Sequence, residues 1–105
     1  MNQFVLFYVG GSHPSDANEQ QRHFNAYKQW LDDLGEAVIS PMNPFKQRSR
    51  VTVEGVKDSS MEAISGYTVL TADSLEQAQA LAKQCPFLDI GGEIEVVELV
   101  AMRNQ

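Results

Sequence analysis

The chain has 105 residues, of which 43% are hydrophobic and 21% charged, as expected for one globular domain spanning residues 1–105. Eight Lys and Arg against fourteen Asp and Glu give a formal net charge of −6. This charge argues against a nucleic-acid partner and against an anionic membrane surface, because both require basic patches. The apolar run at residues 4–9 is too short for a signal sequence or a membrane span. The single Cys85 cannot form an internal disulfide, so we expect a cytoplasmic protein.

The first part of the chain predicts a strand, a helix and a second strand. Residues 4–9 are apolar on both faces, which is typical of a strand buried on both sides. Asp16, followed three residues later by a glutamate, is typical of a helix N-cap, and Gly35 stands where a C-terminal glycine is expected. The apolar positions between them are spaced by three or four: Phe24, Tyr27, Leu31 and Leu34. Residues 36–40 then predict a strand that Pro41 ends.

The second part predicts two more strong strands with a helix between them. Residues 41–65 are mostly polar, with one alternating, strand-like stretch at 50–54. Residues 66–71 form the third strong strand. Ser74, followed three residues later by a glutamine, predicts the cap of a second helix that a proline terminates. The last strand covers residues 94–100.

This order of elements predicts an α+β fold, a ferredoxin-like βαββαβ sandwich with a central hairpin excursion. Two helices can cover only one face of such a sheet, yet the first and last strands are apolar on both faces. A small monomer does not usually leave such a face in water, so we expect a homodimer through the sheet face. The alternative is that residues 41–65 fold over that face.

His23 is the most interesting titratable residue. It lies near the border of the helix's apolar face, beside Tyr27 and Trp30, where a cleft between helix and sheet would open. Because imidazole titrates near neutral pH, His23 is a candidate general base. The alternative is a structural histidine bonded to a backbone carbonyl. Tyr8 or Tyr27 would hydrogen-bond a substrate and Trp30 would wall the site, although these aromatic residues fit ordinary packing equally well.

Other polar residues point less clearly to chemistry. Glu95 alternates with apolar residues on a strand and is either exposed or a carboxylate partner for His23. Glu62 is most simply solvated, and Cys85 is typical of an unreactive residue buried in the core. His13 and His23 lack the spacing of a metal-binding pair, and no third ligand is evident. We therefore expect no metal, and no phosphate-binding glycine motif indicates a nucleotide cofactor.

Several short segments carry a recognisable pattern. They are residues 66–70 (GYTVL), 73–78 (DSLEQA), the pair Cys85-Pro86 and residues 91–96 (GGEIEV). Gly35 and Glu62 fit the same layout. Together these segments resemble the YCII-related family, and among its branches the one with an Asp-Gly-Pro-Phe (DGPF) motif. That tetrapeptide is absent here, as is the arginine of the family's Glu-Val-Arg-Pro ending.

The resemblance implies a dimeric α/β barrel and relatives that include small cofactor-free enzymes. It also implies a helix histidine paired with an aspartate; His23 falls at the histidine, but Cys85 falls at the aspartate. That dyad is incomplete unless Glu62 or Glu95 substitutes. We therefore expect a YCII-like homodimer whose cleft takes a small cyclic or aromatic ligand, acting as a cofactor-free isomerase or lyase through His23. The alternative is a non-catalytic small-molecule-binding or accessory dimer.

Overall fold

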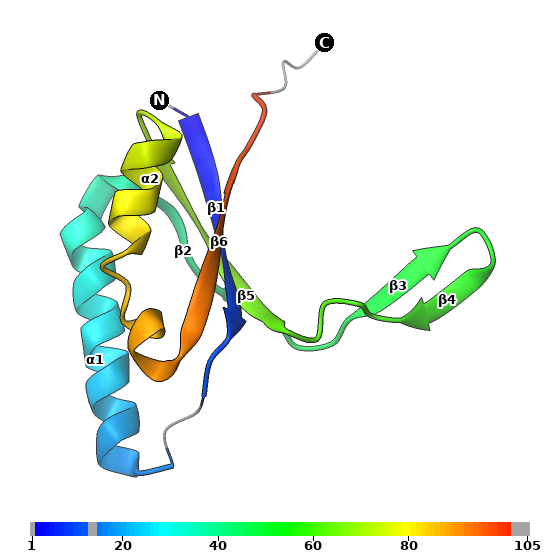
Figure 1. Ribbon diagram of the computed structural model, residues 1–105, viewed down its shortest axis with the longest axis horizontal. Helices are drawn as coiled ribbons and strands as arrows, with labels where there is room; N and C mark the ends of the chain where they lie inside the picture. Colours follow the sequence, from blue (N-terminus) through cyan, green and yellow to red (C-terminus); the bar gives the residue numbers. More distant parts are fainter. Residues whose placement is uncertain (1, 13–14, 102–105) are drawn as a thin grey trace.

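The computed structural model describes residues 2–12 and 15–101, so His13 lies outside the described residues. Within these ranges the chain has an α+β fold, in which two α-helices cover one face of a four-stranded antiparallel sheet (Figure 1). The elements in order are β1 (Asn2–Gly10), α1 (Ala17–Leu34), η1 (Gly35–Ala37), β2 (Val38–Pro44), β3 (Ser49–Thr52), β4 (Gly55–Asp58), β5 (Ile64–Ala72), α2 (Leu75–Ala82), η2 (Pro86–Ile90) and β6 (Gly92–Glu98). Both η elements are single stretches of 3-10 helix.

The main sheet has the strand order β2-β5-β1-β6. Each neighbouring pair is antiparallel, and Leu6 of β1 lies opposite Thr68 of β5 and Val96 of β6. The sheet is open rather than a closed barrel. Alternate residues of the central strands point towards the helices and are fully buried, including Leu6, Thr68 and Leu70. The core of the described chain therefore lies between the sheet and the two helices.

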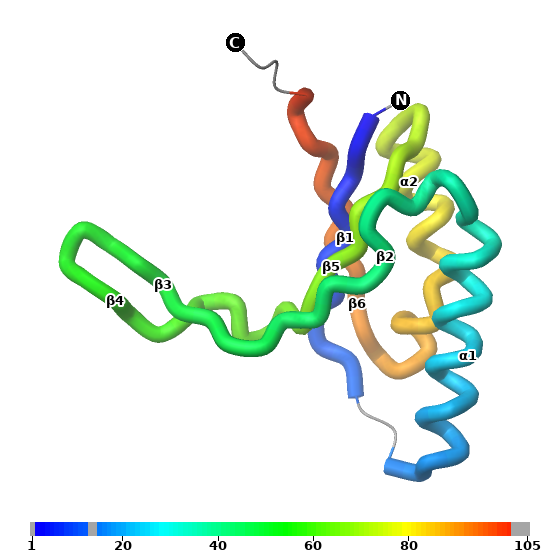
Figure 2. Tube along the Cα trace, turned by 180° about the vertical axis from the view of Figure 1, so that it is seen from behind, coloured from blue at the N-terminus to red at the C-terminus, as the bar shows by residue number. Residues whose placement is uncertain are grey.

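The other face of the sheet is not covered by the helices. Phe7, opposite Tyr67 in the register, and Val69 lie on this face and are half-buried. The β3–β4 hairpin projects on this side, away from the sheet (Figures 1 and 2). Val51 and Val56 face each other across the hairpin and are 75% and 72% exposed. The excursion therefore does not fold back over the uncovered face.

Three of the expected helix ends are confirmed, whereas α2 ends at Ala82, before the predicted Pro86, so Cys85 lies outside the helix. The Asp16 side chain accepts a hydrogen bond from the backbone N–H two residues later, which satisfies a donor of the first turn of α1. Gly35 closes α1 with a positive φ of 57°, and its N–H bonds back to Leu31. Ser74 Oγ likewise accepts from the backbone N–H of Gln77 at 3.1 Å. These ends depend on local contacts, which is why residue spacing predicts them.

The bounds of two strands and the exposure of Phe24 differ from the expectation, and the last strand, β6, covers Gly92–Glu98 rather than residues 94–100. Strand β2 does not end at Pro41 but continues to Pro44. It is an edge strand, where prolines lacking an N–H are tolerated, and its pairing with β5 is irregular between Ser40 and Asn43. Phe24, expected to face the core, is 48% exposed because α1 stands off the sheet there and leaves a cleft.

Within the described residues, neither α1 nor α2 combines the length and apolarity that a helix needs to cross a membrane.

Candidate functional site

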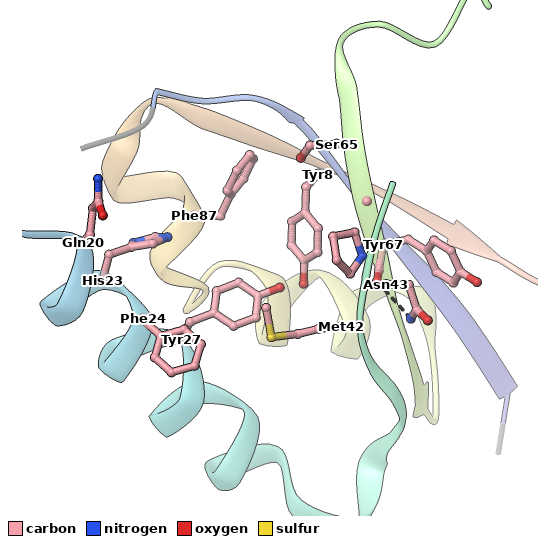
Figure 3. Close-up of a pocket in the computed structure, with 12 residues that line it drawn as sticks. Tyr8, Gln20, His23, Phe24, Tyr27, Met42, Asn43, Ser65, Tyr67 and Phe87 are labelled. Carbon is pink, nitrogen blue, oxygen red and sulfur yellow. Dashed lines mark hydrogen bonds between the residues drawn. The ribbon is translucent and has the colours of Figure 1, made fainter. Parts of the chain in front are cut away.

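A cleft of about 340 Å³ opens between α1 and the β2–β5 edge of the sheet (Figure 3). Its volume is within the range of about 300–1,000 Å³ that is usual for small-molecule sites. The lining residues come from α1 (Gln20, His23, Phe24, Tyr27), β1 (Tyr8), β2 (Met42, Asn43, Pro44), β5 (Ser65, Gly66, Tyr67) and η2 (Phe87). The four α1 residues share one helix face because they are spaced by three, one and three.

The cleft brings together three of the residues singled out by the sequence. His23 is half-buried and points into the cleft from α1, with its ring centroid 6.3 Å from that of Tyr27 (Figure 3). Tyr8 and Tyr27 are buried, and their rings meet edge to face at 5.8 Å. An imidazole and two phenols therefore face one apolar space.

Trp30 does not line the cleft. It is buried behind Tyr27, and the two rings meet edge to face with 5.6 Å between their centroids. Its indole N–H donates a hydrogen bond of 3.1 Å to the backbone carbonyl of Leu81, in the last turn of α2. Trp30 thus joins α1 to α2 and supports Tyr27 from the side away from the cleft.

Glu62 and Glu95 are not among the residues that line the cleft. Glu62 is exposed in the turn that precedes β5. Glu95 is exposed on β6 and lies opposite Phe7 in the register, on the face of the sheet away from α1. The sheet therefore stands between Glu95 and His23.

A hydrogen-bonded chain of hydroxyl groups lies at the inner end of the cleft. Tyr8 Oη is 2.5 Å from Thr68 Oγ1, and Thr68 Oγ1 donates to the carbonyl oxygen of Pro41, also at 2.5 Å. Burial raises the pKa of Tyr8 far above its ordinary range. Burial raises the pKa of Tyr27 to about 12, although hydrogen bonding to Tyr8 and Thr68 opposes the shift. Both phenols therefore keep their protons at neutral pH.

Cys85 lies just after α2, at the start of η2, and is 2% exposed. Burial raises the pKa of its thiol to about 11. If Cys85 were ionised, the charge of the thiolate would raise the pKa values of Tyr8 and Tyr27. A buried, protonated thiol is a poor nucleophile. In the part of the chain that the structure describes, no three His, Cys, Asp or Glu side chains gather in a way that could hold a metal ion.

Several lining residues were not predicted from the sequence. Asn43 is fixed by the β2 irregularity, where its side-chain N–H group donates to Ser40 Oγ and to the carbonyl of Tyr67. Gly66 allows β2 to approach β5, because a Cβ there would lie 2.7 Å from the carbonyl oxygen of Asn43. Thr68 does not line the cleft itself but hydrogen-bonds with Tyr8, and it had a signal in the sequence because it is a polar residue at a buried position of β5.

The fold and the cleft define an α+β domain with a small-molecule-sized site made of aromatic, thioether and amide side chains around one imidazole. A family model for the YCII-related domain matches residues 5–103. The chain therefore belongs to the YCII-related family, as the short motifs indicated. Comparison with curated proteins found no match.

Proposed function

We propose that the cleft binds a small cyclic or aromatic molecule and that His23 transfers a proton on it, in a cofactor-free isomerase or lyase. The observation that carries the proposal is the convergence of His23, Tyr8 and Tyr27 on one apolar space. The walls of Phe24, Met42 and Phe87 suit a ring, because apolar and aromatic surfaces provide most of the contact area in small-molecule sites.

In this reaction the neutral imidazole of His23 removes a proton from an activated carbon of the ring. A phenol of the cleft holds the substrate by a hydrogen bond while the electron pair moves into the conjugated system. In an isomerase, the imidazolium returns the proton to a different carbon; in a lyase, a leaving group departs with the electron pair. Both routes need only an imidazole within reach of the ring and no external oxidant.

A non-catalytic role is the second candidate, and one observation favours it. The aspartate that the family resemblance pairs with the helix histidine is replaced by the buried thiol of Cys85. Neither Glu62 nor Glu95 lines the cleft to take its place. Under this alternative the cleft binds a metabolite and releases it unchanged.

The experiment compares His23→Gln with Arg22→Ala, a control one residue away whose side chain is exposed and outside the cleft. Enolisable cyclic ketones and hydroxyaromatic compounds are incubated with each protein in deuterated water. We expect deuterium exchange at a ring carbon with the wild type and the control, and its loss in His23→Gln with the melting temperature retained. Binding without exchange in the wild type would support the non-catalytic alternative. Exchange that persists in His23→Gln would exclude His23 as the base.

We further propose that the protein is a homodimer in which the uncovered faces of two sheets pack together, giving a dimeric α/β barrel. The strand order β2-β5-β1-β6 supports a ferredoxin-like unit, and the motifs of residues 66–96 support the DGPF branch despite its missing tetrapeptide. Phe7, Tyr67 and Val69 give the uncovered face its apolar character, and Val97 at its edge is 40% exposed. The projecting hairpin leaves room for a second sheet (Figure 2).

Sedimentation velocity tests this interface with Val69→Glu, at the centre of the uncovered face, against Ala80→Glu on the exposed surface of α2. Both substitutions add the same charge. We expect a dimer for the wild type and for Ala80→Glu, and a folded monomer for Val69→Glu, because a carboxylate buried between sheets is strongly unfavourable. A wild-type monomer, or a Val69→Glu dimer, would refute the interface.

A further inference from the structure

The β3–β4 hairpin differs from the rest of the chain in its charge. Residues 45–58, which include the hairpin, contain four of the eight Lys and Arg residues but only two of the fourteen Asp and Glu residues. This segment therefore carries a formal charge of +2, whereas the rest of the chain carries −8. The four basic side chains are all exposed: Lys46, Arg48, Arg50 and Lys57. The hairpin is thus a basic arm on an otherwise acidic protein.

The two faces of the hairpin have different chemistry. Arg50 lies directly opposite Lys57 in the antiparallel register, and like charges in such a pair destabilise a hairpin. Among the residues that the structure describes, neither side chain has a carboxylate partner. Val51 and Val56 form a second pair on the other face and are exposed as well. Because an isolated two-stranded hairpin is only marginally stable, this arm is suited to pack on an acidic surface that is partly apolar.

The root of the hairpin holds the arm in a fixed direction. The guanidinium of Arg48 donates to the backbone carbonyl oxygens of Met61 and Ile64, which follow β4 in the chain. It also lies over the ring of Phe45, 5.4 Å from the centroid, and that ring is 5.9 Å from the ring of Tyr67 in the sheet. Arg48 therefore ties together the segments before and after the hairpin, and the arm projects on the uncovered side of the sheet (Figures 1 and 2).

Strand β6, at the opposite edge of the sheet, has the complementary charge. Its sequence contains three glutamates and no basic residue. Glu93 and Glu95 lie opposite Val9 and Phe7 in the register, so both glutamates are on the uncovered face, and both are exposed. Val97 follows them on the same face and is 40% exposed. The uncovered face thus has a basic arm beyond one edge and an acidic, partly apolar strand at the other.

The hairpin leaves the sheet at the level of these glutamates. Pro44, at the end of β2, is aligned across β5 and β1 with Ile94, which stands between Glu93 and Glu95. When two sheets pack face to face about a two-fold axis parallel to the strands, this level is kept and β2 of one copy lies over β6 of the other. The four residues of β3 span roughly 13 Å, which exceeds the roughly 10 Å between packed sheets. The arm of one copy therefore reaches the glutamates of the other.

The second possible two-fold axis in this plane runs across the strands and gives a poorer match. It would place β2 over β2, and each arm would lie beside a strand that contains no acidic residue, Val38–Pro44. Charge complementarity therefore favours the axis parallel to the strands.

We propose that the β3–β4 hairpin is an arm that docks on β6 of a second copy of this chain, with Arg50 and Lys57 against Glu93 and Glu95 of the partner subunit. The inference rests on the proposed homodimer and adds the contact that sets the orientation of its two copies. The two-fold axis repeats the contact, so the dimer has two docked arms.

Sedimentation equilibrium at low salt tests this contact through the dissociation constant of the dimer. Arg50→Glu/Lys57→Glu should weaken the dimer about 10- to 100-fold, because attraction becomes repulsion at both arms. Glu93→Lys/Glu95→Lys should weaken it by a similar factor, although this change brings the net charge closer to zero. Combining all four substitutions exchanges the charges and should restore the dissociation constant to within about threefold of the wild type.

Arg22→Glu/Lys83→Glu is the matched control, because it changes the net charge as the arm variant does, at exposed positions on the helix side. It should keep the dissociation constant within about threefold of the wild type. Circular dichroism should show the same melting temperature for the arm variant and the control, since the arm projects away from the core.

An arm variant that dimerises like the wild type, or a charge exchange that restores nothing, would overturn the docking of the arm but leave the proposed homodimer in place. A wild-type monomer would overturn both. A fluorescent DNA duplex, titrated into the same proteins, tests the other use of a basic ribbon. Duplex binding that the arm variant loses while its dimer is unchanged would overturn the proposal in favour of a nucleic-acid contact.

Discussion

Alkaline pH should destabilise this protein steeply, because three weakly acidic side chains are buried in its core. Burial raises the pKa of Cys85 from 9.0 to about 11 and that of Tyr27 from 10.0 to about 12. The pKa of Tyr8 is raised further still. Each group holds its proton in the folded state at a pH where the unfolded chain has released it.

The sign follows from this difference. When the folded pKa lies above the unfolded value, the stabilisation is complete below the unfolded pKa and is lost as the pH rises towards the folded pKa. At about pH 11 the loss is roughly 2 kcal/mol for Cys85 and roughly 1.4 kcal/mol for each of Tyr8 and Tyr27. Together this is about 5 kcal/mol, which is comparable with the 5–15 kcal/mol that separates most native domains from unfolding.

Guanidinium unfolding in the presence of a thiol reductant, at about pH 8 and about pH 11, measures this loss. The fluorescence of Trp30 reports it, because Trp30 is buried and is the chain's single tryptophan. Tyr27→Phe should reduce the pH dependence by about 1.4 kcal/mol and Cys85→Ala by about 2 kcal/mol. A wild-type loss below about 1 kcal/mol, or an unchanged pH dependence in both variants, would refute the reasoning.

Three further substitutions test contacts around the cleft. Trp30→Phe should cost about 2 kcal/mol in the free energy of unfolding, measured by circular dichroism, because it leaves the Leu81 carbonyl without its indole partner. Gly66→Ala should cost about 1–3 kcal/mol in the same assay, since the new Cβ would lie 2.7 Å from a carbonyl oxygen of β2. Gly92→Ala would overlap the ring of Phe87 and displace it from the cleft wall. We expect it to weaken toluene binding, measured by NMR titration, by about 3- to 10-fold, the value of one aromatic contact.

The sequence predicted most where structure depends on near neighbours. Asp16, Gly35 and Ser74 end or begin helices as expected, since each acts on backbone groups within one turn. The position of His23 at the border of the apolar helix face likewise predicted that it lies where the cleft opens. These features need no knowledge of which strands pair.

The remaining features depend on contacts between distant segments. Continuation of β2 through Pro41 is decided by its place at the sheet edge, which appears only once the strand order is known. Trp30 resembled a cleft wall because it shares a helix with His23, yet its partner is a carbonyl 51 residues away. Which face of the sheet Glu95 occupies also depends on the register of β6 against β1.

The family resemblance implies an aspartate where this chain has Cys85, and this difference bears on the hydroxyl groups of the cleft. A carboxylate at that position would place a negative charge beside Tyr8 and Tyr27, and the phenols would direct their protons towards it. The thiol stays neutral, because burial raises its pKa to about 11. With no charged acceptor there, the carbonyl of Pro41 determines the direction of the hydroxyl protons through Thr68. The Tyr8 hydroxyl proton is therefore used in the bond to Thr68, whose own proton goes to the Pro41 carbonyl.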